Sequence, residues 1–335
     1  MKKISFYTML LALPLIAACS NDDSDNGSAA DEIHFTSQLQ ATATRGTTTW
    51  QETQIASGEH IYVWAEKYSD NSEYFNAWKL VADGNGGFVE PTTKYFPKGN
   101  ATLNFYAIHY NGDFSENTQT MPNSTTGHSH EVEVNQTSAE NFKKSDLLYA
   151  SMQNQGHIRS AVPLTFYHML AKVEVALKLD QVFTSSVTML NASLELMNGT
   201  DGLKKKVTFK PVKTTAAAMS ENANNLRGNM VATENTPTVD RIGIGLPAIT
   251  TDFSDFTEAI LPPQTISGKF IKLTITNSGS TYYGMELYYT LPQALTLQSG
   301  YKYRFNITVS PTVLQGSVTV TEWASGTTTN ILFSN

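Results

Sequence analysis

The sequence predicts an all-β protein, and three observations support this fold class. Short runs in which apolar and polar residues alternate recur between Gly, Asn and Pro turn signals. Tyr and Phe, which favour strands, number 15 and 16. In the longest regular run, Ala171–Leu179, apolar residues point to one side and Lys172, Glu174 and Lys178 point to the other. A helix would scatter these charges around its circumference, so we expect a strand with one buried and one solvated face.

The length and the middle of the chain predict two domains. The 335 residues suffice for two domains of ordinary size. Val162, Leu164 and Phe166 alternate like the run that follows them, so two predicted strands flank Tyr167-His168-Met169. We place the joint near this point and expect one β-domain over residues 33–160 and a second over residues 161–335.

The first 18 residues have the features of a signal peptide. Lys2 and Lys3 make its start positive, and the apolar run of residues 4–18 is too short to cross a bilayer as a stable helix. Cys19 is the single cysteine and cannot form an intramolecular disulfide. Ile16-Ala17-Ala18-Cys19 resembles the lipobox of bacterial lipoproteins, in which the thiol is acylated. We expect a precursor lipidated at Cys19, with an ordinary secretory signal as the alternative.

Residues 19–32 are expected to form a flexible acidic tether. The stretch Ser20–Ser28 has no hydrophobic residue, so it cannot bury enough surface to fold. A serine after the lipidated cysteine, followed by acidic residues, resembles the surface-export signal of some Gram-negative lipoproteins. This resemblance implies a surface-exposed location at the cell outer membrane.

After the tether, Ile33, Phe35 and Leu39 predict a first short strand, followed by a loop rich in Thr, Ala and Gly. Arg45 lies in this loop, with no other Lys or Arg between positions 4 and 66. An isolated arginine among small residues is accessible to an arginine-directed protease. A solvated loop residue without such a role is the other interpretation.

The remaining elements follow from the same alternation. In the first half we expect strands at residues 60–65, 103–108 and 146–150, a hairpin turn at Gly84–Gly87, a loop over residues 111–127 and a helical turn capped by Ser138. In the second half we expect strands at residues 193–196, 207–209, 300–309, 318–323 and 330–333, and a hairpin of residues 270–275 and 285–289. Residues 214–235 lack periodicity and are expected to form a long loop, with a short helix as an alternative.

The charge of the chain argues against nucleic acid as a partner. The net charge is −7, from 23 basic and 30 acidic residues, and the only run of three basic residues is Lys204–Lys206. This run follows Gly202 and is typical of a solvated turn. A phosphate-binding surface needs a longer basic cluster, so we expect no nucleic-acid binding.

No sequence pattern predicts a catalytic residue, a cofactor or a metal. His128 and His130 would face the same side of a strand and could chelate a metal with Glu131 or Glu133 nearby, but their Ser/Thr/Gly surroundings favour an exposed loop. His168 lies beside a core strand and is expected to be a hydrogen-bonded packing residue.

Aromatic and acidic residues are the remaining candidates for a binding or catalytic site. Trp50, Trp64 and Trp78 could stack on sugars, but packing in the core is the preferred interpretation. The acidic residues are scattered, and no pair stands out as the two carboxylates of a glycosidase. The residues alone therefore indicate a surface-anchored β-protein without a visible active site.

Several segments, in order along nearly the whole chain, together resemble the fimbrillin family, the type V pilins of Gram-negative anaerobes. These segments are Ile16–Cys19, Ile33-x-Phe35 followed by Thr44-Arg45-Gly46, Tyr95-x-Pro97 before Leu103–Ala107, Asp146–Ala150, Leu164–Val173, Pro263-Gln264-Thr265, Gly300-Tyr301-x-Tyr303 and Trp323. The resemblance implies two tandem β-sandwich domains of transthyretin-like topology, with short helical turns in loops.

The resemblance also implies a route to assembly. It implies cleavage between Arg45 and Gly46, which would remove residues 33–45 and leave an edge that is costly to expose. A neighbouring subunit would then donate a strand from residues 313–335. Val318, Val320 and Trp323 are the candidate groove-fillers, with a bulge where Trp323 falls out of step. Such a head-to-tail joint does not close and gives a filament.

The function implied by the resemblance is that of a structural, non-enzymatic pilin subunit that supports adhesion. Its partners would be other pilin subunits, an arginine-specific protease, the outer membrane during export and a surface receptor. The alternative is a monomeric surface lipoprotein that binds glycans or acts as an adhesin. A surface hydrolase, the third interpretation, would need two convergent carboxylates, for which the sequence offers no candidates.

Overall fold

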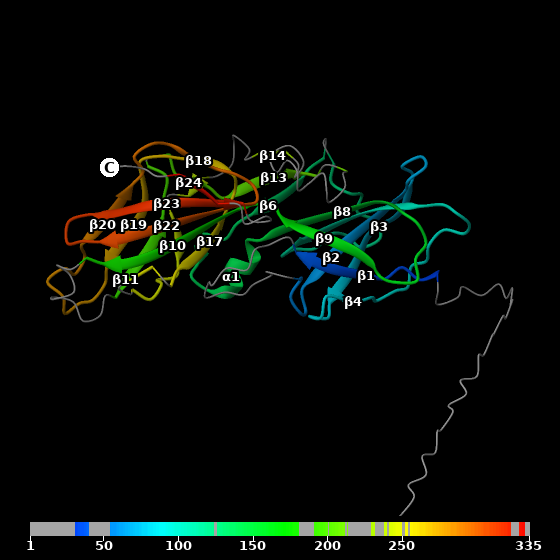
Figure 1. The fold of residues 1–335 in the computed structure, drawn as a ribbon, viewed down its shortest axis with the longest axis horizontal. Helices are drawn as coiled ribbons and strands as arrows, with labels where there is room; N and C mark the ends of the chain where they lie inside the picture. Colours follow the sequence, from blue (N-terminus) through cyan, green and yellow to red (C-terminus); the bar gives the residue numbers. More distant parts are fainter. Residues whose placement is uncertain are drawn as a thin grey trace, which may run out of the picture.

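The computed structural model shows a chain built almost wholly of β-strands (Figure 1). It describes residues 31–39, 54–123, 126–180, 191–199, 201–211, 213, 229–231, 238–239, 241–249, 252–253, 255–322 and 328–331. The helix in this part of the chain is α1 (Ala139–Lys144), and no described helix is long and apolar enough to cross a membrane. The predicted all-β class, with sheets packed in a sandwich-like arrangement, is confirmed.

The largest sheet has seven strands and lies in one half of the elongated molecule (Figure 1). Its order is β1–β9–β8–β5–β2–β3–β4. β1 runs parallel to β9, and every other neighbouring pair is antiparallel. The strands are β1 (Phe35–Leu39), β2 (His60–Lys67), β3 (Glu73–Ala82), β4 (Phe88–Val89), β5 (Leu103–Tyr110), β8 (Leu147–Gln155) and β9 (Val162–His168).

Two five-stranded sheets build most of the other half. One has the order β17–β10–β22–β23–β24 and the other β20–β19–β11–β16–β7. The strands of the first are β10 (Ala171–Leu179), β17 (Thr257–Leu261), β22 (Tyr301–Val309), β23 (Leu314–Glu322) and β24 (Thr328–Ile331). Those of the second are β7 (Asn135–Gln136), β11 (Ala192–Leu196), β16 (Ile242–Ile244), β19 (Lys269–Ile275) and β20 (Glu286–Thr290).

Three small sheets complete the described strands. They pair β12 (Leu203–Lys204) with β15 (Thr238–Val239), β18 (Gln264–Ile266) with β21 (Leu295–Leu297), and β13 (Lys206–Lys210) with both β14 (Asn229–Val231) and β6 (His128–Glu131). The predicted hairpins are present as β3–β4 and β19–β20. Ser138 caps α1 as predicted, because its hydroxyl oxygen accepts the Asn141 N–H at 3.2 Å.

The large sheet is buried on both faces. Along β2, Ile61 and Val63 belong to a core cluster confined to the large sheet and the segments around it, whereas Tyr62 and Trp64 belong to a second cluster shared with the strands of the other half. Met169 and Leu170, both fully buried, are the only residues between β9 and β10. The second cluster is therefore a core that the two halves share.

The predicted domain boundary at residue 160 stays a prediction. The strands near it cross between the halves: β9 follows residue 160 but pairs with β8 and β1, whereas β6 and β7 precede it but pair with β13 and β16.

One prediction about β10 is wrong. The strand forms where expected, but Lys172 and Glu174 are buried, at 4% and 3% exposure, and do not face solvent. β10 lies between β17 and β22, which carry charges of their own. Lys172 forms an ion pair with Glu258 of β17, and Arg304 of β22 lies 3.6 Å from the Glu174 carboxylate. Mutual pairing makes burial of these charges tolerable.

Candidate functional site

β1 joins the two edges of the large sheet. Five of its residues are in parallel register with β9 on one side. On the other side, the Ser37 N–H donates to the Gly86 carbonyl at 2.7 Å, and the Ile33 N–H donates to the Lys94 carbonyl at 2.8 Å. Gly86 has a φ of +89°, a conformation that side chains rarely adopt, and it brings this carbonyl against β1. We call the space occupied by residues 33–39 the β1 slot.

Apolar side chains anchor β1 in the slot. Ile33, Phe35 and Leu39 are buried, as the alternation predicted. The Phe35 ring meets Phe105 at 5.1 Å and Trp78 at 6.0 Å, both edge to face. Each fully buried side chain of this size contributes about 1.5–3 kcal/mol through removal of apolar area from water. Loss of this short strand would therefore remove a substantial part of the core.

The slot also has polar requirements that sequence reasoning missed. Ser37 is 8% exposed, and its hydroxyl oxygen accepts the Ile55 N–H at 3.3 Å. The Val162 N–H donates to the His34 carbonyl at 2.7 Å. Without β1, the N–H groups of Ile55 and Val162 would lose their hydrogen-bond acceptors. The carbonyls of Gly86 and Lys94, on the other side of the slot, would lose their donors. Such losses are costly wherever water cannot replace the missing partner. Ser37 lies between Phe35 and Leu39 at the alternate positions that face inward. That position in the sequence is the observation from which a buried hydroxyl acceptor could have been predicted.

The residues predicted for processing lie outside the described part of the chain. These are Cys19, Arg45 and Gly46, together with Trp323 among the candidate groove-fillers. Their assignments remain predictions.

Val318 and Val320, the other two candidate groove-fillers, lie in β23. They are 1% and 8% exposed and pack in the core of their own half. β23 is in register with β22 over nine residues and with β24 over four. In this structure both valines thus complete the sheet of their own chain, and a role in a neighbouring subunit remains a prediction.

A pair of carboxylates lies close together in the buried charge network of β10, β17 and β22. Glu174 and Glu258 are register partners, and Lys172 forms ion pairs with both. Burial raises the pKa of Glu174, although the positive charge of Lys172 opposes this rise. Both side chains are almost fully buried. The arrangement therefore resembles a structural network rather than the exposed acid pair of a hydrolase.

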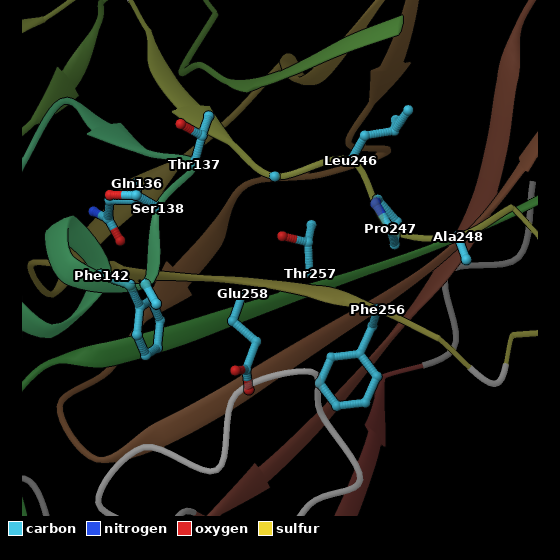
Figure 2. A pocket seen from close by; sticks show the side chains of 12 residues that line it. Gln136, Thr137, Ser138, Phe142, Leu246, Pro247, Ala248, Phe256, Thr257 and Glu258 are labelled. Atoms are coloured by element: carbon cyan, nitrogen blue, oxygen red, sulfur yellow. The ribbon is translucent and has the colours of Figure 1, made fainter. Parts of the chain in front are cut away.

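Glu258 also lines a pocket of about 310 Å³ in front of α1 (Figure 2). Phe142 approaches from α1, Leu246 and Pro247 come from the segment after β16, and Phe256 and Glu258 come from β17 and the residue before it. The pocket thus combines apolar walls with a carboxylate that is already ion-paired. Glu258 is the only carboxylate among the residues that line this pocket.

The predicted exposed loop around His128 and His130 is wrong. Both residues lie on β6, where pairing with β13 buries His130 to 4% exposure. The His130 Nε2–H donates to the Ser145 carbonyl at 3.0 Å. Burial lowers the pKa of both imidazoles, that of His128 to about 4. Among the described residues, no three His, Cys, Asp or Glu side chains gather to hold a metal ion.

His168 is the packing residue that the sequence predicted. Its Nδ1 lies 3.1 Å from the Asp146 Oδ1, and both side chains are 2% exposed. Burial by itself would raise the pKa of Asp146, but the charge and hydrogen bond of His168 outweigh this effect and hold the pKa below its ordinary value.

Packing of the tryptophans in the core is confirmed for the two that the structure describes. Trp64 and Trp78 are each 1% exposed, and the Trp64 Nε1–H donates to the Gln119 carbonyl at 2.7 Å. Neither ring is available to stack on a sugar. Trp50 lies outside the described residues.

Comparisons with known proteins agree with this architecture. The fimbrillin-like family matches residues 44–323. A candidate cell adhesion protein from Bacteroides ovatus aligns with a TM-score of 0.60 at 16% identity, over 91% of this chain and 99% of its own. One from Bacteroides uniformis aligns with a TM-score of 0.56 at 18% identity, over 87% of this chain and 98% of its own. These likenesses show a common fold.

No curated protein matches the chain. The family match, however, covers most of the sequence and both halves of the structure, because residues 44–323 include every described strand from β2 to β23. The chain belongs to the fimbrillin-like family.

Proposed function

We propose that the chain is a structural, non-enzymatic subunit of a cell-surface fimbria that supports adhesion and polymerises by strand exchange. Membership of the fimbrillin-like family supports a fimbrial role. The observation that carries the mechanism is β1, a short core strand near the start of the chain that fills a slot bonded on both sides. A strand of this kind can be removed and replaced by an equivalent strand from a neighbour.

The proposed sequence of events begins at the membrane. Lipidation of Cys19 anchors the precursor to the outer membrane through the tether of residues 19–32. An arginine-specific protease then cuts between Arg45 and Gly46, six residues beyond the end of β1. The cut frees residues 33–45, and residues 313–335 of another subunit supply a replacement strand. Repetition of this joint produces an open filament.

Limited proteolysis of the purified chain, beginning at Ser20, tests this proposal. An arginine-specific protease should cut after Arg45, as located by mass spectrometry, and filaments should then appear by negative-stain electron microscopy. The Arg45→Ala variant should remain a monomer. Arg159→Ala is the matched control, because Arg159 is an exposed arginine in the loop between β8 and β9, and this variant should still form filaments.

Filaments formed equally well by Arg45→Ala would refute the order of events. A cut chain that stays monomeric at every concentration would refute polymerisation by strand exchange. Binding of such a monomer to a glycan array would favour the alternative of a monomeric adhesin.

A further inference from the structure

We propose that Asn85 is a site of spontaneous deamidation, and that this modification weakens the hold of the surrounding turn on β1. Asn85 lies in the turn of residues 83–87, which joins β3 to β4. The inference concerns the chain before any cut or assembly. It therefore stands or falls independently of the proposed function.

The reaction needs only the chain and water. The backbone nitrogen of Gly86 attacks the Cγ of Asn85, a C–N bond forms, and the side-chain nitrogen leaves as ammonia with the proton that the attacking nitrogen gives up. Water then opens the cyclic succinimide. Cleavage of its bond to Cγ yields aspartate, whereas cleavage of its bond to the main-chain carbonyl yields isoaspartate, in which the chain continues through Cγ. A glycine after the asparagine favours the attack, because no Cβ shields its nitrogen.

Both reacting groups at this position are without a partner. The Asn85 side chain is exposed, and no described residue forms a hydrogen bond with its amide. The Gly86 N–H likewise has no acceptor in the part of the chain that the structure describes. The backbone around them is fixed, because the Asp83 Oδ1 accepts the N–H of Asn85 at 2.6 Å and that of Gly87 at 3.0 Å. The turn thus presents the asparagine to its neighbour while leaving the reacting atoms free.

A buried Asn-Gly pair in the other half provides the contrast. Asn198 is 7% exposed. Its side chain makes three hydrogen bonds of 2.9–3.2 Å to backbone groups, those of Gly202, Thr265 and Ser267. The next N–H, that of Gly199, donates to the Lys269 carbonyl at 2.9 Å. All four hydrogen bonds would have to open before Asn198 could react.

The Asn111-Gly112 pair is restrained in a different way. The Gly112 N–H donates to the Tyr110 carbonyl at 3.0 Å, and the His60 Nε2–H donates to the Gly112 carbonyl at 3.0 Å. The Tyr110 ring packs so closely that a Cβ on Gly112 would lie 2.3 Å from it. The attacking nitrogen is therefore engaged here, whereas it is not at Gly86. A fourth pair, Asn26-Gly27, lies outside the described residues.

The residues after Asn85 connect the reaction to β1. The Gly86 carbonyl accepts the Ser37 N–H at 2.7 Å, and Gly87 forms an isolated bridge with Thr36. These contacts hold the side of β1 that faces away from β9. Any change in the length or charge of the turn is therefore transmitted to the edge of β1.

Isoaspartate changes both. It adds one carbon atom to the backbone between positions 85 and 86, and it leaves a carboxylate close to that of Asp83, which already accepts two N–H groups of the turn. The added length and the repulsion between like charges both displace the Gly86 carbonyl from the Ser37 N–H. β1 then keeps its pairing with β9 but loses this contact on its other side.

Peptide mapping of the aged chain tests the site. The uncut chain, beginning at Ser20, is incubated in water labelled with heavy oxygen, which enters every product formed during the incubation. Digestion in ordinary water and mass spectrometry then give the modified fraction at each Asn-Gly pair.

Asn85 should react at least about tenfold faster than Asn198, because each of the four hydrogen bonds at Asn198 lowers the reactive fraction by roughly two- to tenfold. It should also react faster than Asn111. Equal rates at Asn85 and at either of these positions, or no reaction at Asn85, would overturn the assignment.

Hydrogen exchange resolved to single amides tests the effect on β1. In the modified chain, separated by its added charge and identified by the same mapping, the Ser37 amide should exchange about fivefold faster, because it loses its acceptor. The Ile33 amide provides an internal control. It donates to the Lys94 carbonyl on the same side of β1, outside the turn, and should keep its rate. Unchanged exchange at Ser37 would overturn the effect on β1.

Asn85→Gln is the matched variant. The glutamine side chain keeps the amide but is one carbon longer and closes a less favourable ring, so this variant should stay unmodified at position 85. After the same incubation it should retain the slow exchange of the Ser37 amide. Equal loss of Ser37 protection in Asn85→Gln would overturn deamidation at Asn85 as the cause.

Discussion

His128 packs its ring 4.3 Å from Tyr110 and 4.9 Å from Phe114, and its Nε2 has no hydrogen-bond partner within the described structure. An imidazole in such surroundings stays neutral at neutral pH, because protonation would place a charge among aromatic rings. His130, two residues along the strand, is more fully buried, at 4% exposure, and its Nε2–H donates to the Ser145 carbonyl. Protonation of these buried histidines at acidic pH should therefore destabilise this region.

We expect His128 to steepen the loss of stability below neutral pH. Its pKa in the folded chain is about 4, below the value near 6.5 in the unfolded chain, so between these values the unfolded state binds more protons. The free energy of unfolding should therefore fall as the pH is lowered through this window, by up to about 2 kcal/mol between pH 7.5 and pH 5 from this group. Replacement of His128 by Phe should remove that part of the decline, as measured by urea unfolding at the two pH values.

A neighbouring residue without a titrating side chain provides the control. Ser129 is an exposed residue between the two histidines of β6, so Ser129→Ala should show the pH dependence of the wild type. An unchanged decline in His128→Phe would contradict the expectation.

Gly316 shows how one small residue allows two strands to pair. It opposes Ile307 in the β22–β23 ladder. A Cβ atom at this position would lie 2.5 Å from both the Asn306 carbonyl oxygen and the Ile307 Cδ1. The side chain could move aside, but the backbone carbonyl cannot do so without disturbing the ladder.

We therefore expect Gly316→Ala to lower the free energy of unfolding by about 1–3 kcal/mol, the usual cost of forcing an extra methyl group into a packed site. Urea unfolding at neutral pH measures this change in the free energy of unfolding. Gly156→Ala is the matched control, because its new Cβ would meet only Thr102 Cγ2, at 3.7 Å, and it should be neutral or slightly stabilising. Equal stability of the two variants would show that β22 and β23 can separate locally without cost.

Local sequence patterns predicted where the strands lie, but they did not predict which faces of those strands other elements bury. Alternation located β1 and β10, because a period of two is a property of neighbouring residues. It could not show that Lys172 and Glu174 are buried, because their partners come from other strands far away in the sequence. The sequence places His130 in an exposed loop for the same reason: the residues beside it are polar, whereas β13, which pairs with its strand and buries it, follows about 75 residues later in the chain.

The candidate site was predictable to a similar degree. The inward face of β1 was evident from Ile33, Phe35 and Leu39. The acceptor role of Ser37 was not, because it depends on the N–H of Ile55, which only the fold brings close. Sequence therefore indicates which strand fills a slot, and structure indicates what each place in the slot requires.

The whole molecule is expected to unfold as one unit. Its largest core cluster contains residues from both halves, among them Trp64 and Phe305, and the two-residue link between β9 and β10 is fully buried. Differential scanning calorimetry should show a single transition, with equal calorimetric and van't Hoff enthalpies.

Two variants on opposite sides of the molecule test this cooperativity. Leu80→Ala lies in the cluster of the large sheet and Leu273→Ala in the shared cluster, and both side chains are fully buried. Each should shift the same single transition to lower temperature. Two peaks that respond separately would show that the halves unfold independently.

The short link between β9 and β10 also has a mechanical consequence. In a filament joined through the β1 slot, tension would enter each subunit along β9, cross Met169 and Leu170, and continue into β10. β10 passes it to β22 through a parallel register of eight residues, aligned with the pull. Hydrogen bonds between strands that are pulled along their length share the force. Hydrogen bonds between strands that are peeled apart from one end break one after another. The same fold that buries the core would thus make each subunit a stiff segment of a load-bearing thread.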